Sequence, residues 1–165
     1  MKNEKAVRIG GACGFLGDTS ISTPQLIDGG DVNYMVYDYL AEVTMSLLAR
    51  VKAKRLEMGY AQYFTDVVIQ ENIEDISRKK IRMISNAGGV NPEACRDKIL
   101  EIAAKAGIAI KVAVIQGDDL MPRLEELKQS DITDMYTGKS WPDGMMSINA
   151  YLGARPIAEA LDAGA

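Results

Sequence analysis

The chain has 165 residues, of which 47% are hydrophobic and 25% are charged. This composition is typical of one soluble globular domain that buries a core without disulfides or structural metals. The net charge of −4 argues against nucleic acid or an anionic membrane as a partner. The absence of histidine excludes the commonest general base and the commonest metal ligand from this chain.

The cysteines and the amino terminus predict a cytoplasmic protein. Cys13 and Cys95 lack CxxC spacing, so we expect free thiols in a reducing compartment. Residues 1–5 contain no apolar signal segment, and no apolar run in the chain is long enough to cross a bilayer.

Four short apolar segments are the predicted strands, and amphipathic segments between and after them are the predicted helices. The strands are residues 6–9, 32–37, 81–85 and 110–115; the helices are residues 39–59, 92–107, 121–130 and 155–165. Residues 130–148 are predicted to form a long irregular loop. The alternation predicts one α/β domain over residues 1–165, with three layers and a mostly parallel sheet that carries helices on both faces.

Glycine-rich turns follow two of the predicted strands. The sequence GGACGFLGD follows the first strand, and NAGGVN follows the third. Such turns expose backbone N–H groups that bind a phosphate, a carboxylate or a developing oxyanion, and tight packing is the alternative. The predicted ligand-binding glycines are Gly10, Gly11, Gly14, Gly88 and Gly89.

Acidic and amide residues also cluster after the strands, at the sheet edge where open α/β sheets bind ligands. The predicted rim consists of Asp18, Asp38, Asn86, Asn91, Asp118 and Asp119. Asp38 or Asp118 is the predicted acid or base, and the two asparagines orient the ligand. If Asp38 caps the following helix, Glu42 faces the same site; otherwise both acids simply stabilise a helix N-terminus.

Two features of this rim have alternative interpretations. The Asp118-Asp119 pair offers oxygen ligands for a divalent cation, but adjacent side chains usually point apart. One aspartate would then face the ligand while the other caps the helix at Pro122. Cys13 is a weaker candidate nucleophile, since a helix N-terminus would favour its thiolate but no histidine can activate it. We therefore expect no metal, and no cofactor is firmly implied.

Six motifs in the same order resemble the acyclic terpene utilisation protein A family. They are VRIGGACGFLGDT, VNYMVYDYLAEVTMSLLAR, GYAQYFTD, SNAGGVNPEACRDKI, KVAVIQGDDLMPRLEEL and NAYLGARPIAEALDAGA. The resemblance runs from about residue 7 to the last residue and covers the N-terminal region of a family whose members are longer. In the family a strand close to DIVITGR usually follows the last motif. We therefore expect the sheet to be completed by another chain or by a missing C-terminal part.

The resemblance also implies a set of site residues and a substrate class. The implied site residues are Asp18, Asp38, Glu42, Asn86, Asn91, Asp118 and Asn149. The family's founding member belongs to the bacterial breakdown of citronellol- and geraniol-type acids through CoA thioesters. The position before Asn149 is often small in the family and is Ile148 here.

These observations favour an enzyme, or an enzyme subunit, that acts on a carboxylic acid or its acyl-CoA thioester. We expect hydration, dehydration or C–C cleavage next to a carbonyl, as catalysed by a hydro-lyase or lyase. The alternative is a non-catalytic binding or assembly subunit that forms an oligomer with a second chain carrying the rest of the family domain. A nucleotide-binding domain is a third interpretation, because Asp38 lies near the expected ribose-binding acid, but the glycine pattern is irregular.

Overall fold

A computed structural model describes residues 6–165; residues 1–5, where no targeting segment is predicted, lie outside the described part. The sheet has three parallel strands in the order β1 (Ile9–Cys13), β2 (Tyr34–Tyr37) and β3 (Arg82–Ser85). The predicted α/β class with a parallel sheet is therefore confirmed.

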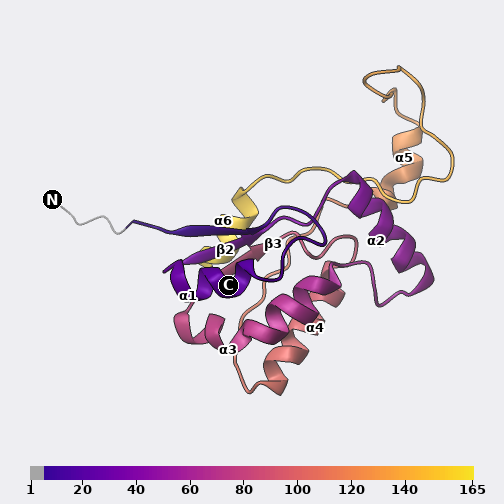
Figure 1. Cartoon of the computed structure of the whole chain (residues 1–165). Coiled ribbons are helices and arrows are strands. Elements are labelled where there is room, and N and C mark those ends of the chain that lie inside the picture. The colour runs from indigo at the N-terminus through magenta and orange to yellow at the C-terminus, as the bar shows by residue number, and fades with distance from the viewer. Residues whose placement is uncertain (1–5) are drawn as a thin grey trace.

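The connections between the strands cover one face of the sheet. Helix α1 (Ser22–Gly29) joins β1 to β2, and α2 (Glu42–Lys54), a π-helix η1 (Phe64–Ile69) and α3 (Gln70–Lys79) join β2 to β3. Right-handed crossovers between parallel strands place α1, η1 and α3 on a common face, whereas α2 lies beside the sheet (Figure 1). Helix α4 (Pro92–Lys105) follows β3 and packs on the same side (Figure 1).

The last helix lies on the opposite face. Helix α6 (Arg155–Asp162) packs across the other side of the sheet (Figure 1), where Arg82 donates a hydrogen bond to the carbonyl of Leu161. A short 3₁₀ helix η2 (Met121–Arg123) and α5 (Leu124–Lys128) precede the irregular residues 130–148, which project from the body. The predicted helices at both positions and the predicted loop are confirmed.

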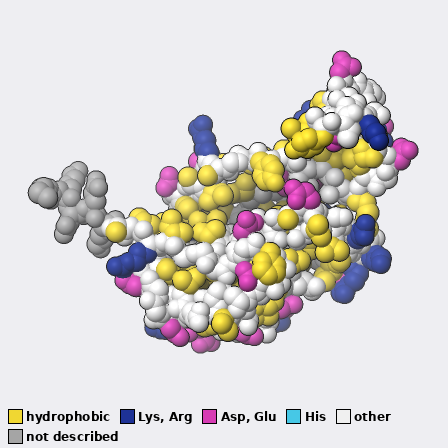
Figure 2. Space-filling model, turned by 45° about the horizontal axis from the view of Figure 1, so that its top comes forward, with side chains coloured by type: hydrophobic (Ala, Val, Ile, Leu, Met, Phe, Trp, Pro, Cys, Tyr) yellow, Lys and Arg dark blue, Asp and Glu magenta, His cyan; other side chains and the backbone are white. Residues whose placement is uncertain are grey.

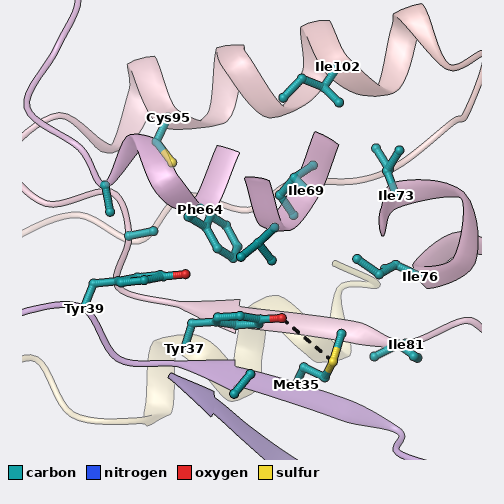
Figure 3. Packing of buried hydrophobic residues seen from close by; sticks show 14 of the residues in the cluster. Met35, Tyr37, Tyr39, Phe64, Ile69, Ile73, Ile76, Ile81, Cys95 and Ile102 are labelled. Atoms are coloured by element: carbon teal, nitrogen blue, oxygen red, sulfur yellow. Dashed lines mark hydrogen bonds between the residues drawn. The ribbon is translucent and has the colours of Figure 1, made fainter. Parts of the chain in front are cut away.

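An aromatic cluster fills the core between the sheet and the helices (Figure 3). Tyr37 ends β2 and Tyr39 lies two residues beyond it, and the ring of Phe64 lies edge-on to both, at centroid distances of 5.3 and 5.9 Å. The Tyr37 hydroxyl hydrogen-bonds the hydroxyl of Thr23 at 2.8 Å, which joins β2 to α1. Met35 of β2 is 0% exposed, so its side chain packs at the centre of this layer.

The first strand begins later than predicted. β1 spans Ile9–Cys13, so Gly10 and Gly11 lie within a strand and not in a loop after it. A Cβ atom on Gly10 would lie 2.9 Å from Leu26 and 3.3 Å from Val32. The absence of a side chain therefore lets α1 approach β1 closely, which favours the packing interpretation at this glycine.

The predicted fourth strand does not form. Residues 110–115 alternate between half-buried and exposed positions up to Val114, as a strand would, but they carry no strand assignment. None of these six residues shares a backbone hydrogen bond with another backbone group among the described residues. An apolar run creates a strand only where a neighbouring edge lies within hydrogen-bonding distance, and no described part of the chain provides one here.

Within residues 6–165 no helix combines the length and apolar character needed to cross a membrane.

The buried thiol of Cys95 predicts a specific loss of stability at alkaline pH. Burial in the core raises the pKa of Cys95 from its ordinary value of 9.0 to about 12. Between these values the unfolded chain loses a proton that the folded chain keeps. The free energy of unfolding therefore falls as the pH rises, by up to about 1.4 kcal/mol per pH unit.

Urea denaturation of the wild type and Cys95→Ala from about pH 8 to about pH 11 measures this contribution. We expect the variant to lose stability less steeply with pH. Cys13→Ala, which removes the half-buried thiol, should retain most of the wild-type slope. Equal slopes for the wild type and Cys95→Ala would contradict the expectation.

Candidate functional site

A cavity of about 1220 Å³ opens at the carboxyl ends of β2 and β3 and extends along the free edge of β3. Seven of the predicted site residues line it: Asp38, Glu42, Asn86, Gly88, Gly89, Asp118 and Asn149. Figure 2 shows acidic side chains beside a hollow that lies between apolar areas of the surface. The fold thus brings Asp38 and Asn149, which are 111 positions apart in the chain, to one cavity.

The first polar pair of the cavity joins the ends of β2 and β3. The Asn86 side chain donates its Nδ2–H to Oδ1 of Asp38 at 2.6 Å. Its own Oδ1 accepts the backbone N–H of Tyr39 at 2.8 Å. Because Asn86 is held at both ends, it fixes the orientation of the exposed Asp38 carboxylate.

The second pair has the same composition. Asn149 donates its Nδ2–H to Oδ2 of Asp118 at 3.0 Å, and the Ala150 N–H donates to the Asp118 carbonyl at 2.8 Å. The Asp119 carboxylate points elsewhere and accepts the N–H of Met121, the first residue of η2, at 2.9 Å. One aspartate thus lines the cavity while its neighbour accepts the first N–H of a helix, although the N-cap of that helix is Leu120 and not Asp119 as predicted.

The divalent cation interpretation gains no support from this geometry. The carboxylates of Asp118 and Asp119 have different partners, as described above. Across residues 6–165, no three His, Cys, Asp or Glu side chains come close enough together to hold a metal ion.

The glycine turn after β3 serves packing as well as the cavity. The N–H of Gly89 donates to the Asn86 carbonyl, whereas the Gly88 N–H has no backbone partner among the described residues. Gly89 has φ +53°, and a Cβ atom there would lie 2.5 Å from Leu48 and 2.7 Å from the carbonyl oxygen of Gly59. Gly88 is thus the residue of this turn that retains a donor for an anion.

Several predicted site residues lie outside the cavity lining. Asp18 closes its own loop, because its carboxylate accepts the N–H of Gly14 at 3.0 Å and of Thr19 at 2.7 Å. Asn91 donates to the carbonyls of Leu56 and Met58, at 2.9 and 2.7 Å, and thereby anchors the segment after α2. The others outside the lining are Gly10, Gly11, Gly14 and Asp119.

These contacts correct two details of the sequence analysis. A carboxylate of the chain itself occupies the N–H of Gly14, so this donor is not available to an external anion. Helix α2 begins at Glu42 with Ala41 as its N-cap, so Asp38 does not cap it. Both acids nevertheless line the same cavity.

The environment of Cys13 does not favour a thiolate. Its Sγ lies 3.0 Å from the carbonyl oxygen of Phe15, to which it can donate a hydrogen bond. Burial raises the pKa of the Cys13 thiol, and the negative charges of Asp18 and Asp38 add to the rise. A protonated thiol is a weaker nucleophile than a thiolate, so this environment disfavours the nucleophilic role considered for Cys13.

Sequence reasoning missed a group of cations at the far end of the cavity. The basic side chains that line it there are Lys80, Arg82 and Lys111. Lys80 lies just before β3 and Arg82 is its first residue, whereas Asp38 directly follows the end of β2. The predicted strands at residues 81–85 and 110–115 contained a usable signal, because a cation interrupts each near its beginning.

Fold and site together define an α/β protein with a parallel sheet and paired acidic and amide groups at its carboxyl edge. The chain belongs to the acyclic terpene utilisation family, since the model of the family protein AtuA matches residues 7–165. No curated protein and no solved structure is significantly similar to the chain.

The tight packing around Gly89 predicts a large effect of a single methyl group. Gly89→Ala should lower the free energy of unfolding by about 2–4 kcal/mol, because left-handed backbone strain adds to the clash with Leu48. Gly107→Ala is the matched control, since Gly107 has φ +68° but open space around its Cβ position. It should cost only the strain, about 1–2 kcal/mol. Equal losses in urea denaturation would show that the clash is relieved.

Proposed function

We propose that this chain is an enzyme, or part of one, that acts on a small carboxylic acid or its CoA thioester within acyclic terpene utilisation. The reaction is hydration, dehydration or C–C cleavage next to a carbonyl. The observation that carries the proposal is the pairing of two aspartates, Asp38 and Asp118, each with an asparagine on the wall of one cavity. Family membership supports the pathway.

The two carboxylates, each hydrogen-bonded to an asparagine, suit proton transfer in a chain without histidine. In a hydration, one aspartate takes a proton from water as the oxygen bonds to the β-carbon of an unsaturated thioester. The other aspartate, protonated, delivers its proton to the α-carbon. Each asparagine holds one carboxylate oxygen, as in Asn86–Asp38 and Asn149–Asp118, and leaves the second oxygen for the proton.

The carbonyl oxygen gains negative charge in such a reaction and needs a donor. The Gly88 N–H lies in the cavity wall without a backbone partner among the described residues. We assign it to the stabilisation of this developing charge, which is the role that backbone N–H groups play in oxyanion holes. The apolar residues deeper in the cavity, which include Ile99 and Leu161, suit a hydrocarbon chain.

The alternative is a non-catalytic subunit that completes its site with a partner chain. One observation favours it: the cavity continues past the polar rim along the β3 edge, where no strand within residues 6–165 pairs with β3. Size exclusion and native mass spectrometry separate the two. A stable monomer that turns over acyl-CoA supports the enzyme, whereas obligate association with a second polypeptide supports the subunit.

The enzyme proposal predicts that removing either paired carboxylate abolishes turnover. Asp38→Asn and Asp118→Asn should lower kcat by about 10²–10⁴, since proton transfer is lost while shape and hydrogen bonding are retained. The melting temperature should stay nearly unchanged. The assay incubates the protein with branched acyl-CoA thioesters, saturated and unsaturated next to the carbonyl, and follows the mass of the thioester.

Asp119→Asn is the matched control, because Asp119 lies outside the cavity lining and an asparagine can still accept the Met121 N–H. It should retain activity. Full activity in both cavity variants would refute the proposed roles, and no turnover of any thioester by the wild type would favour the subunit alternative.

A further inference from the structure

Helix α2 carries an apolar stripe that the described part of the chain leaves open to solvent. The stripe consists of Val43, Leu47 and Val51, which are 72%, 50% and 39% exposed. Apart from these three, the helices of residues 6–165 expose one large apolar side chain, Leu100 of α4. Exposed apolar surface that gathers in one place, and is not scattered, is typical of an interaction site.

A different face of α2 attaches the helix to the rest of the chain. Thr44, Leu48 and Ala49 are its buried residues. On the same side, Lys52 donates a hydrogen bond to the carbonyl of Val90 at 2.5 Å. The α2 stripe is therefore not needed to hold the helix in place.

The spacing of the α2 stripe matches itself when the direction of the helix is reversed. Its three residues are four positions apart, so they form one ridge along the helix. In an antiparallel pair of α2 helices centred on Leu47, Val43 of each copy lies opposite Val51 of the other. A twofold axis beside Leu47 generates this arrangement, and twofold symmetry is the commonest symmetry of soluble dimers.

The ridge next to the α2 stripe has opposite charges at its two ends. It consists of Glu42, Ser46, Arg50 and Lys54, again four positions apart. None of its three charged side chains forms an ion pair with another of the described residues. In the antiparallel pair, Glu42 of each copy lies beside Arg50 and Lys54 of the other, so unlike charges meet twice. A parallel pair would bring like charges together instead.

We propose that a second copy of this chain binds at α2, with the two α2 helices antiparallel and centred on Leu47. The α2 stripes pack against each other, and the neighbouring ridges pair through their charges. Neither a continuation of this chain nor an unrelated polypeptide requires a stripe that matches itself in reverse, so the symmetry favours a second copy.

This dimer also affects the cavity. Glu42 is part of the cavity lining, so Arg50 of the partner subunit approaches the acidic rim of each cavity. The interface itself does not depend on acyl-CoA turnover. Because it consists of one helix from each copy, it is at the small end of protein interfaces, and we expect a dissociation constant of roughly 1–100 µM.

Sedimentation of the purified whole chain over a concentration range that brackets this constant tests the proposal. We expect an equilibrium between monomer and dimer. Leu47→Glu places two like charges at the centre of the contact and should weaken dimerisation by about 100-fold or more. Leu100→Glu is the matched control, because Leu100 is also exposed on a helix but lies on α4, and it should leave dimerisation unchanged.

Exchange of charges tests the antiparallel orientation. Glu42→Lys and the double variant Arg50→Glu/Lys54→Glu each bring like charges together twice, so each should weaken self-association about tenfold. An equimolar mixture of the two variants should associate about as tightly as the wild type, because each supplies the charges that the other lacks. Melting temperatures of the separate variants check that they fold.

Each outcome supports or overturns the proposal. Recovery of the dimer in the mixture supports it, whereas a mixture no tighter than its separate components overturns it. Association that Leu47→Glu does not weaken also overturns it. A wild type that stays monomeric throughout overturns it too, and would mean that another polypeptide or a continuation of the chain covers the α2 stripe. None of these measurements involves a thioester, so failure of this proposal and failure of the enzyme proposal are distinguishable.

Discussion

The side chain of Asn86 is the contact on which the arrangement of the candidate site depends. One amide group accepts the Tyr39 N–H and donates to Asp38, so it joins the carboxyl ends of β2 and β3. The carbonyl of the same residue accepts the Gly89 N–H and closes the glycine turn. A single residue therefore sets the orientation of a carboxylate and the path of the chain into α4. Such contacts preorganise the groups that would touch a substrate.

The sequence was informative where local signals and topology agree. Pro92 and Gly107 bracket a helix that forms over Pro92–Lys105, because proline suits the first turn and glycine the exit. Parallel pairing of β2 and β3 then placed Asp38 and Asn86 on one cavity, whereas Asp118 reaches the same cavity from a segment that does not join the sheet. Helix α1 was missed because eight residues that contain Pro24 and end in glycine resemble a turn. Helix α3 was also missed, although the three-residue spacing of its buried Ile73 and Ile76 is typical of a helix.

Glycine spacing alone could not separate packing from binding. Gly10 and Gly89 are both in tight spaces, where a methyl group would meet Leu26 or Leu48. Gly11, one residue further along β1, has open space around its Cβ position and no such requirement. The distinction depends on which helix lies against each glycine, and that is a property of the tertiary structure. The same limit applies to residues 110–115, whose apolar pattern is that of a strand but whose backbone has no hydrogen-bond partner within residues 6–165.

The charges along the cavity are held in different ways. Asp38 follows the end of β2, whereas Lys80 and Arg82 lie at the beginning of β3, with Arg82 bonded to the carbonyl end of α6 through Leu161. A helix C-terminus carries partial negative charge, so this placement of cations is stable without any ligand. The acidic end is held differently, since neutral donors, the amides of Asn86 and Asn149 and the N–H of Leu40, hydrogen-bond its two carboxylates. Neutral donors orient a carboxylate without forming an ion pair, which suits a group that has to exchange protons with a substrate.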